Sequence, residues 1–487
     1  MDKPYQNFIN GVWESGQPVR EVLDPATNRP FASFHEAGRD EVERAVASSK
    51  QAFDKSEWKK NPSLRAKSLF KLAELIRSNT EPLARLETLE TGHPIKETRH
   101  AIGAAVANFE YFAGLTDKIE GNYIPVNANT FSYTIRDPLG VTAHIVPWNH
   151  PFLLMARGVA PALAYGNTAV IKPSVTAPVT NFEFGRLVEQ AGLPAGVVNV
   201  VCGAGAVCGE ALAAHPQVRK IVFTGGFEAG QRIMELSMKN LTPVLFELGG
   251  KAPFIVCDDV DIDEALDGVL MTALSGQGEI CFAGTRFLIP ASIYDAFAEQ
   301  LVKRVAAIRL GPGISEATEM GPLITARHLE SVDRFVQEAR NQGARILTGG
   351  AKVTTGELAA GNFYQPTIVD RIAGGARICK EEVFGPVLTL MKYGSEEEAL
   401  AIANDVAFGL AAYVWTNDLR RAHRLAAGLE TGAVSIFNYG YGAMIPRGGY
   451  KLSGLGRECG QHAVEEYTQI KNVTIGLGRF PTKYARR

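Results

Sequence analysis

The chain has 487 residues, of which 46% are apolar, and its 50 lysines and arginines nearly balance 52 aspartates and glutamates. This length exceeds one ordinary hydrophobic core and indicates two or three domains. The balanced charge, with no basic run longer than the terminal Arg486 and Arg487, argues against nucleic acid or an anionic membrane surface as a partner.

The ends and the rare residues of the chain suggest its compartment. Residues 1–10 lack the apolar run of a signal peptide, and the longest apolar stretches are interrupted before they reach a membrane-spanning length. Six cysteines without a C-x-x-C pair are typical of free thiols in a reducing compartment. We therefore expect a soluble cytoplasmic protein. Nine histidines without ligand spacing predict no metal site.

The first 140 residues favour short strands, then helices, then an extended segment. Apolar residues recur at helical spacing from Asp40 onward and over Ser63–Ser78, Pro82–Glu90 and Ala101–Leu115. Residues 121–140 change to an extended pattern with strand composition. That segment can form an internal hairpin or an arm that reaches another subunit.

From Val141 the chain alternates between strand and helix. Apolar, β-rich runs occur at Val141–Val146, Thr168–Ile171, Val197–Val201 and Lys220–Phe223. This alternation predicts a doubly wound parallel sheet, which binds ligands at the carboxyl ends of its strands. A second α/β unit begins after Lys251. The predicted fold class is therefore α/β, with two Rossmann-like domains.

Two glycine-rich turns could hold a phosphate group. The turn Gly203–Gly209 follows a strand, but its third glycine comes one position too late for G-x-G-x-x-G, so it favours a simple tight turn. Residues Phe223–Gly230 close a strand and open a helix. The free N–H groups and positive dipole end of that helix make it the better pyrophosphate site.

Three segments carry the chemistry. Cys281 lies among small residues in Ser275–Arg286, which suggests a nucleophile, although free cysteines are often simply buried. Together with Glu247-Leu-Gly-Gly-Lys251 and Pro147-Trp-Asn-His150, this segment resembles the aldehyde dehydrogenase superfamily, in its hydrolytic, non-acylating type. Glu381–Pro386 and Pro446–Glu458 extend the resemblance over almost the whole chain.

The resemblance implies oxidation of an aldehyde to a carboxylic acid with NAD(P)⁺. Cys281 would attack the carbonyl group, with the Asn149 amide and the Cys281 N–H as oxyanion donors. After hydride transfer, water activated by Glu247 would hydrolyse the thioester, and Glu458 matches a relay position. From the residues alone, Asn149 could be a turn residue and Glu247 a solvated strand-end glutamate.

The resemblance also implies a set of coenzyme contacts. These are Val146, Pro147, Trp148, Lys172, Ser174, Val175, Gly205, Phe223, Thr224, Gly225, Gly226, Leu248, Glu382 and Phe384. Gly226 stands where the family has serine, which removes one side-chain hydrogen bond to phosphate. Val175 stands where many relatives have a glutamate that binds the ribose hydroxyls, so NADP is not excluded and the preference for NAD is slight.

Several residues bear on the substrate. Arg157 lies eight residues after Asn149, a spacing at which sequences similar to succinic semialdehyde dehydrogenases have an arginine that binds the substrate carboxylate. Arg447 replaces a family phenylalanine beside the tunnel to Cys281. The resemblance therefore implies a semialdehyde or another acid-bearing aldehyde, which a guanidinium can bind. Either arginine could instead pair with Glu279 or another internal acid. Glu279 itself stands where relatives often have glutamine, and it would raise the pKa of the Cys281 thiol unless it turned outward or became neutral.

Other residues could line the same pocket. Ile280 and Phe282 flank the nucleophile, while Tyr439 and Tyr441 could line a pocket for an aromatic or other neutral aldehyde. A CoA-acylating relative is a further alternative, but it would not need Glu247 to activate water. A non-catalytic protein on the same scaffold is disfavoured because Cys281, Asn149 and Glu247 are all present.

The resemblance finally implies a division of the chain. Residues 1–120 and 141–249 would form the coenzyme-binding domain, and residues 250–465 the catalytic domain. Residues 121–140 and 466–487 would form a small β oligomerisation arm, and the protein would be a homodimer or homotetramer.

Overall fold

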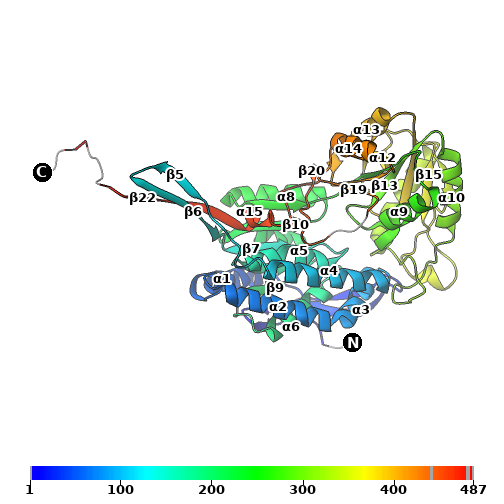
Figure 1. Ribbon diagram of the computed structural model, residues 1–487. Coiled ribbons are helices and arrows are strands. Elements are labelled where there is room, and N and C mark those ends of the chain that lie inside the picture. Colours follow the sequence, from blue (N-terminus) through cyan, green and yellow to red (C-terminus); the bar gives the residue numbers. More distant parts are fainter. Residues whose placement is uncertain (1–2, 439–441, 479–482, 485–487) are drawn as a thin grey trace.

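The computed structural model describes residues 3–438, 442–478 and 483–484, which form two large sheets and a projecting three-stranded sheet (Figure 1). In the first sheet, the five adjacent strands β9, β8, β7, β10 and β11 are parallel to one another. The full order is β2 (Val12–Glu14), β1 (Asn7–Ile9), β9 (Val198–Val200), β8 (Thr168–Lys172), β7 (Val141–Ile145), β10 (Val218–Thr224), β11 (Val244–Glu247) and β21 (Gly454–Leu455).

Helices cover both faces of the first sheet, so its central strands are apolar without interruption. Ala169 and Ile171 of β8 pack into one core cluster with residues of several helices, while Val170 packs into another on the opposite face. The helices of the first cluster include α2 (Pro62–Ser78), α3 (Thr80–Thr91), α4 (Ile95–Ala113), α5 (Pro151–Ala164) and α6 (Val179–Gln190). The opposite cluster includes α1 (Arg39–Lys55), α7 (Glu210–Ala213) and α8 (Phe227–Ser237).

The second sheet has seven strands, all parallel to their neighbours except β14. Its order is β14 (Arg345–Thr348), β15 (Thr367–Asp370), β16 (Val387–Tyr393), β13 (Gly284–Pro290), β12 (Ala252–Val256), β18 (Ala411–Trp415) and β19 (Ala433–Ile436). Its helices are α9 (Ile262–Leu274), α10 (Tyr294–Ala306), α11 (Ala326–Asn341), α12 (Arg377–Lys380), α13 (Glu396–Asn404) and α14 (Leu419–Gly428). The α/β class with two parallel sheets, predicted from the sequence, is confirmed.

The third sheet projects from the first (Figure 1). It consists of β5 (Tyr123–Asn127), β6 (Thr130–Pro138) and β22 (Thr468–Gly476), all antiparallel. The short α15 (Ala463–Tyr467) leads into β22 and packs on the first unit. Smaller pairs are formed by β3 (Val19–Asp24) with β4 (Arg29–His35) and by β17 (Phe408–Gly409) with β20 (Tyr450–Lys451).

The helices expected in the first hundred residues are present with shifted ends. The last of them begins at Ile95 rather than Ala101, because Pro94 provides an N-terminal boundary at the start of α4. Gly92 ends α3 in the left-handed conformation, with φ 81°, two residues before Pro94. Within the described residues, no helix has the length and apolar character needed to cross a bilayer.

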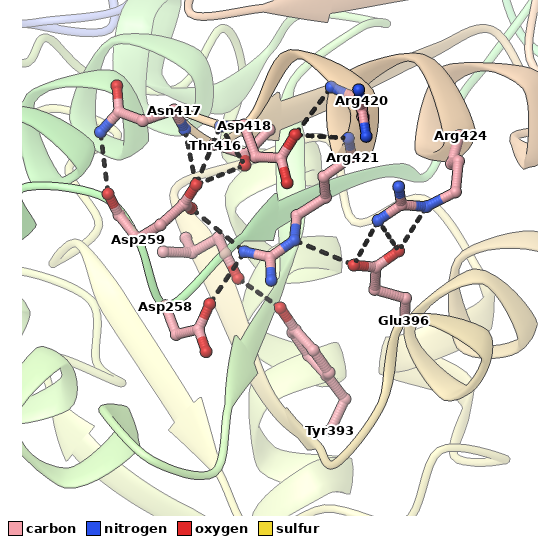
Figure 2. A network of polar contacts seen from close by, with 11 residues as sticks. Asp258, Asp259, Tyr393, Glu396, Thr416, Asn417, Asp418, Arg420, Arg421 and Arg424 are labelled. Atoms are coloured by element: carbon pink, nitrogen blue, oxygen red, sulfur yellow. Dashed lines mark hydrogen bonds and ion pairs between the residues drawn. The ribbon is translucent and has the colours of Figure 1, made fainter.

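A polar network secures one end of the second sheet (Figure 2). The Asp259 Oδ2 atom, just beyond β12, accepts hydrogen bonds from Thr416 Oγ1, Asn417 N and Asp418 N, each at 2.9 Å. These donors follow β18, so one carboxylate ties the carboxyl ends of two adjacent strands. The preceding residue, Asp258, is more exposed. Among the described residues, its carboxylate forms one ion pair, with Arg421.

We predict that Asp259→Ala destabilises this unit more than Asp258→Ala does. Removing Asp259 takes away the acceptor of the Asn417 N–H, one of two acceptors of the Asp418 N–H and an ion pair with Arg421, at a cost of about 1 to 3 kcal/mol. Removing Asp258 breaks an exposed ion pair worth less than about 1 kcal/mol. Thermal unfolding of the two variants beside the parent chain measures the difference, and equal midpoints for both variants would contradict this account.

Candidate active site

Glu247 is the last residue of β11 and is held from both sides. It pairs in register with Thr224 of β10 and with Gly454 of β21. The Leu248 N–H donates to the Ser453 carbonyl at 2.8 Å, so the chain beyond the strand end is also fixed. β21 comes from a segment that the sequence assigned to the catalytic domain, yet it closes the edge of the first sheet.

The cysteine segment follows α9 through a tight turn over Ser275–Gly278. Gly276, Gln277 and Gly278 all have positive φ angles of 53° to 71°, which is unusual for the glutamine. The side chain of Gln277 donates to the Pro322 carbonyl at 2.9 Å and so supports that conformation. Cys281 then lies just before β13, with part of its surface exposed.

Direct backbone contact joins the glutamate and cysteine segments. A Cβ atom on Gly250 would lie 2.4 Å from the Cys281 carbonyl oxygen, closer than real Cβ contacts allow. Only glycine therefore fits at position 250 without a backbone shift. The segment that follows β11 and the loop before β13 therefore meet at Gly250.

The guanidinium group of Arg157 lies between two buried carboxylates. On α5, its Nη2 atom is 2.6 Å from Glu458 Oε2 and 3.6 Å from Glu247 Oε2, and each side chain is at most 4% exposed. The sequence favoured Arg157 as a ligand for a substrate carboxylate. The structure instead shows the internal pairing that was the alternative, with Glu458 and Glu247 as partners rather than Glu279.

These charges set the protonation of the reactive groups. Burial raises the pKa of Glu247 above its ordinary value, Glu458 raises it further, and Arg157 and Arg447 lower it. Burial likewise raises the pKa of the Cys281 thiol to about 12; Glu247 adds to that rise and Arg157 opposes it. The thiol is therefore protonated at neutral pH in this structure, and its ionisation depends on the charges around it.

Asn149 is buried beside the cysteine segment. It lies two residues before Pro151, the first residue of α5, and its Nδ2 atom donates to the Glu279 carbonyl at 2.9 Å. An amide group has two N–H donors, so this bond orients the group and leaves one donor for another acceptor.

Glu279 does not affect the thiol in the way the sequence suggested. Its carboxyl group turns inward, is fully buried, and accepts a hydrogen bond from the Ile324 N–H at 3.0 Å. Burial raises its pKa well above the ordinary value, which favours the neutral form of the group. A neutral carboxyl group adds no negative charge beside Cys281.

The predicted pyrophosphate site has the expected backbone geometry. Gly226 is the N-cap of the 11-residue helix α8 and has no side chain to cap it, so the N-cap residue provides no side-chain acceptor for the first N–H groups of the helix. These N–H groups fit an anionic pyrophosphate, although the exposed Glu228 in the first turn opposes it. Phe223 and Gly225 contact one another just before this turn.

Other predicted coenzyme residues lie along the strand ends of the same sheet. Lys172 ends β8, and its Nζ atom donates to the Pro173 carbonyl at 2.9 Å. The Ser174 hydroxyl accepts from the Thr176 N–H, and Val175 packs against the first core cluster. Gly205 begins a π-helical turn over Gly205–Gly209, where the sequence predicted a tight turn.

A second group of predicted coenzyme residues gathers beside the glutamate segment. Glu382 accepts a hydrogen bond from the Gly250 N–H at 3.0 Å, and burial raises its pKa to about 7. The Phe384 and Trp148 rings pack edge to face at 5.2 Å between centroids, and Phe384 has a positive φ of 56°. Val146 and Leu248 are buried, and Pro147 is half-buried.

The remaining substrate candidates are less closely grouped. Ile280 is buried, and half-buried Phe282 packs against the core of the second unit. Arg447 is half-buried, and its backbone exchanges two hydrogen bonds with Glu458 at 2.7 and 2.8 Å. Tyr439 and Tyr441 lie outside the described residues.

Sequence reasoning missed the residues behind the cysteine loop. His328 on α11 and His93 before α4 both lie within 4 Å of the Glu279 carboxyl group. Neither histidine stands in a motif, and only the three-dimensional arrangement brings them to Glu279, two residues before Cys281. No group of potential ligands suited to a metal ion occurs in the described part of the chain.

The comparisons with known proteins agree with this geometry. The model of the "Aldehyde dehydrogenase family" matches residues 13–473. Betaine aldehyde dehydrogenase of Bacillus subtilis (strain 168) is 43% identical, with 96% of each chain covered, and hydroxyisobutyraldehyde dehydrogenase of Mycolicibacterium austroafricanum is 40% identical, with 98% of this chain and 95% of the relative covered.

Solved structures show the same fold. Betaine aldehyde dehydrogenase from Staphylococcus aureus in complex with NAD⁺ superposes with a TM-score of 0.97 at 36% identity, covering 99% of this chain and 97% of that one. An α/β oxidoreductase is the class that the fold and these matches define. This chain belongs to the aldehyde dehydrogenase family and is an NAD(P)-dependent aldehyde dehydrogenase.

We predict opposite effects on Cys281 when its two charged neighbours are neutralised. Glu247→Gln removes a negative charge that raises the pKa of the thiol, so alkylation of Cys281 becomes faster at a fixed pH near 9. Arg157→Gln removes a positive charge that lowers this pKa, so alkylation becomes slower.

Mass spectrometry of the Cys281 peptide after timed iodoacetamide exposure measures both rates. Arg157→Lys keeps the charge and serves as the control, so its alkylation rate should stay nearer to that of the parent. Changes of the same sign in the Glu247 and Arg157 variants would contradict the electrostatic account.

Proposed function

We propose that Cys281 is the nucleophile of a hydrolytic aldehyde dehydrogenase and that Glu247 is its general base. The observation that carries this proposal is the contact of the two segments through Gly250, beside a buried Asn149 amide. Cys281 Sγ would bond to the aldehyde carbon as its proton passes to Glu247, the proposed general base. The free Asn149 N–H and the Cys281 N–H would stabilise the resulting oxyanion.

The residues at the strand ends fit a nicotinamide coenzyme. The N-terminus of α8 would hold the pyrophosphate, Lys172 the adenosine ribose, and Glu382 and Phe384 the nicotinamide end. The bound coenzyme would supply the hydride acceptor. No carboxylate stands at Val175 to bind both ribose hydroxyls, so the proposed preference for NAD over NADP is slight.

Glu247 and Glu458 would complete the reaction. Glu247, with a raised pKa, would take a proton from the water that attacks the Cys281 thioester, and the acid and free thiol would be released. Glu458, which contacts the same Arg157 guanidinium, would pass that proton on. A CoA-acylating enzyme would have no use for this pair of carboxylates.

The units would divide the work as the sequence suggested. Residues 1–120 and 141–249 would bind the coenzyme, and residues 250–465 would carry the nucleophile. Residues 121–140 and 466–487 would form an oligomerisation arm. The protein would act in the cytoplasm. The arm leaves apolar side chains exposed, including Tyr123 and Ile470 at 62% each, which supports a homodimer or homotetramer.

We predict that Cys281→Ala abolishes NAD(P)H formation and leaves coenzyme binding intact. The substitution removes the only atom that forms the covalent adduct and keeps the backbone N–H. Activity is followed by absorbance of the reduced coenzyme, and binding by fluorescence titration. Cys257→Ala, a buried cysteine beyond β12, is the matched control and should retain activity. Full activity in the Cys281 variant would refute the proposed mechanism.

The geometry supports a neutral aldehyde somewhat better than an acid-bearing one. Arg157 is engaged by Glu458 and Glu247, so an acid-bearing substrate would depend on Arg447 for its charge. Among the relatives, hydroxyisobutyraldehyde dehydrogenase has a neutral aldehyde in its name. A semialdehyde remains the second candidate because Arg447 lowers the pKa of both Glu247 and Cys281 and therefore lies near the reaction centre.

We predict values of kcat/KM for succinic semialdehyde and for a neutral aldehyde of equal chain length that differ by less than about tenfold. Each is measured with NAD and with NADP. A hundredfold preference for the semialdehyde, about 2.7 kcal/mol of differential transition-state binding, would favour carboxylate binding by Arg447. In that case Arg447→Gln should remove the preference, whereas Arg371→Gln at an exposed site should not.

A further inference from the structure

Behind Cys281 the cysteine loop meets two other segments that lie far apart in the sequence. A Cβ atom on Gly278 would lie 2.4 Å from the Gly385 carbonyl oxygen, and one on Gly385 would lie 2.7 Å from Val332 Cγ2. Val332 belongs to α11. The cysteine loop, the Phe384 segment and α11 are therefore in contact with no space for a methyl group between them.

The Glu279 carboxyl group lies in this three-way junction. Its Oε1 atom accepts from the Ile324 N–H at 3.0 Å, just before α11, and lies 3.6 Å from His328 Nε2. Its main-chain carbonyl accepts from the Asn149 amide at 2.9 Å. One residue thus contacts α11 through its side chain and the predicted oxyanion donor through its backbone, two positions before Cys281.

His328 connects the same junction to the predicted nicotinamide site. Its Nε2–H donates to the Phe384 carbonyl at 2.6 Å. Its ring packs edge to face against Trp148, at 5.5 Å, and against Phe384, at 6.1 Å between centroids. A shift of Phe384 would therefore move His328, and His328 faces the carboxyl group of Glu279.

The carboxyl group has one further neighbour. Its Oε2 atom lies 3.9 Å from the Nε2 atom of buried His93, and neither atom has a hydrogen-bond partner in the described part of the chain. Because Oε1 already accepts a hydrogen bond, a proton on the neutral carboxyl group belongs on Oε2. A glutamine side chain would offer the same pattern, with its oxygen toward Ile324 and its NH₂ toward His93.

We propose that Glu279 and His328 are a pair of positioning residues that transmit coenzyme occupancy at Phe384 to Asn149 and Cys281. The pair acts through its hydrogen-bonding shape and not through charge. The roles of Asn149, Cys281 and Phe384 in this inference rest on the proposed function. Neither Glu279 nor His328 touches the reacting atoms.

The test compares shape-preserving and shape-removing variants of both residues. Glu279→Gln and His328→Gln keep a group of similar reach, whereas Glu279→Ala and His328→Leu remove it. For each variant, the alkylation rate of Cys281 is measured without and with saturating NAD⁺, together with kcat and KM for aldehyde. Thermal unfolding identifies any variant that fails to fold, and the Gln variants still test the idea if an Ala or Leu variant does.

We expect NAD⁺ to change the alkylation rate of Cys281 in the parent chain and in both Gln variants by similar factors. In Glu279→Ala and His328→Leu that factor should fall to about one, and kcat/KM should fall at least tenfold. The double variant Glu279→Ala/His328→Leu should have a kcat/KM no lower than that of the more impaired single variant, because both substitutions interrupt the same connection. Glu330→Gln, at an exposed site on the same helix, is the control and should match the parent.

Three results would overturn the inference. The first is a parent-like response to NAD⁺ in Glu279→Ala and His328→Leu. The second is a Glu279→Gln variant whose Cys281 alkylation rate responds to NAD⁺ as weakly as that of Glu279→Ala, which would mean that an ionised carboxylate matters. The third is a parent chain whose thiol does not respond to NAD⁺. None of these depends on turnover, so they are distinct from the failure of the proposed function, which is tested by Cys281→Ala.

Discussion

One buried guanidinium group, Arg157, serves two buried carboxylates, Glu247 and Glu458. Withdrawing an ion from water costs several kcal/mol unless an opposite charge compensates it. One cation cannot compensate two anions fully, so a proton on Glu247 becomes more favourable and its pKa rises. The Cys281 thiol lies in the same field: burial and Glu247 raise its pKa, and Arg157 lowers it. Removal of Arg157 would leave both carboxylates without this partner, at a cost of about 3 to 5 kcal/mol for a broken buried pair.

The fold can hold this arrangement because its parts come from rigid strand ends and close backbone contacts. Glu247 ends β11, next to the edge strand of the first sheet, and is flanked by β10 and β21, so its backbone has little freedom. Gly250 lets the following segment lie against the Cys281 carbonyl, and Gly249 leaves space for the Glu382 carboxyl group. A methyl group added at Gly249 or Gly250 would disrupt the contact made there. The glycines beside the glutamate therefore do as much for the site as the charged residues do.

The sequence predicted the parts of this molecule that depend on local pattern. Strand and helix alternation from Val141 indicated the parallel sheets, and the short segments around Asn149, Glu247 and Cys281 indicated where to look for chemistry. It could not predict the partners of Arg157, because both carboxylates lie far along the chain and meet it only when α5, β11 and the β21 loop pack together. The strand β21 itself is two residues long, which is too short for any periodic signal.

Glu279 shows why residue type and spacing do not determine charge. Its position two residues before Cys281 suggested a negative neighbour for the thiol, but the left-handed turn over 276–278 directs its side chain into the protein. There it meets a backbone N–H and two histidines whose pKa values are themselves lowered by burial, so no cation is present among these neighbours to stabilise a carboxylate. Glu247, equally buried, has an arginine beside it. Of these two glutamates, only Glu247 can therefore change its charge at modest cost, while Glu279 is suited to hold a fixed hydrogen-bonding shape.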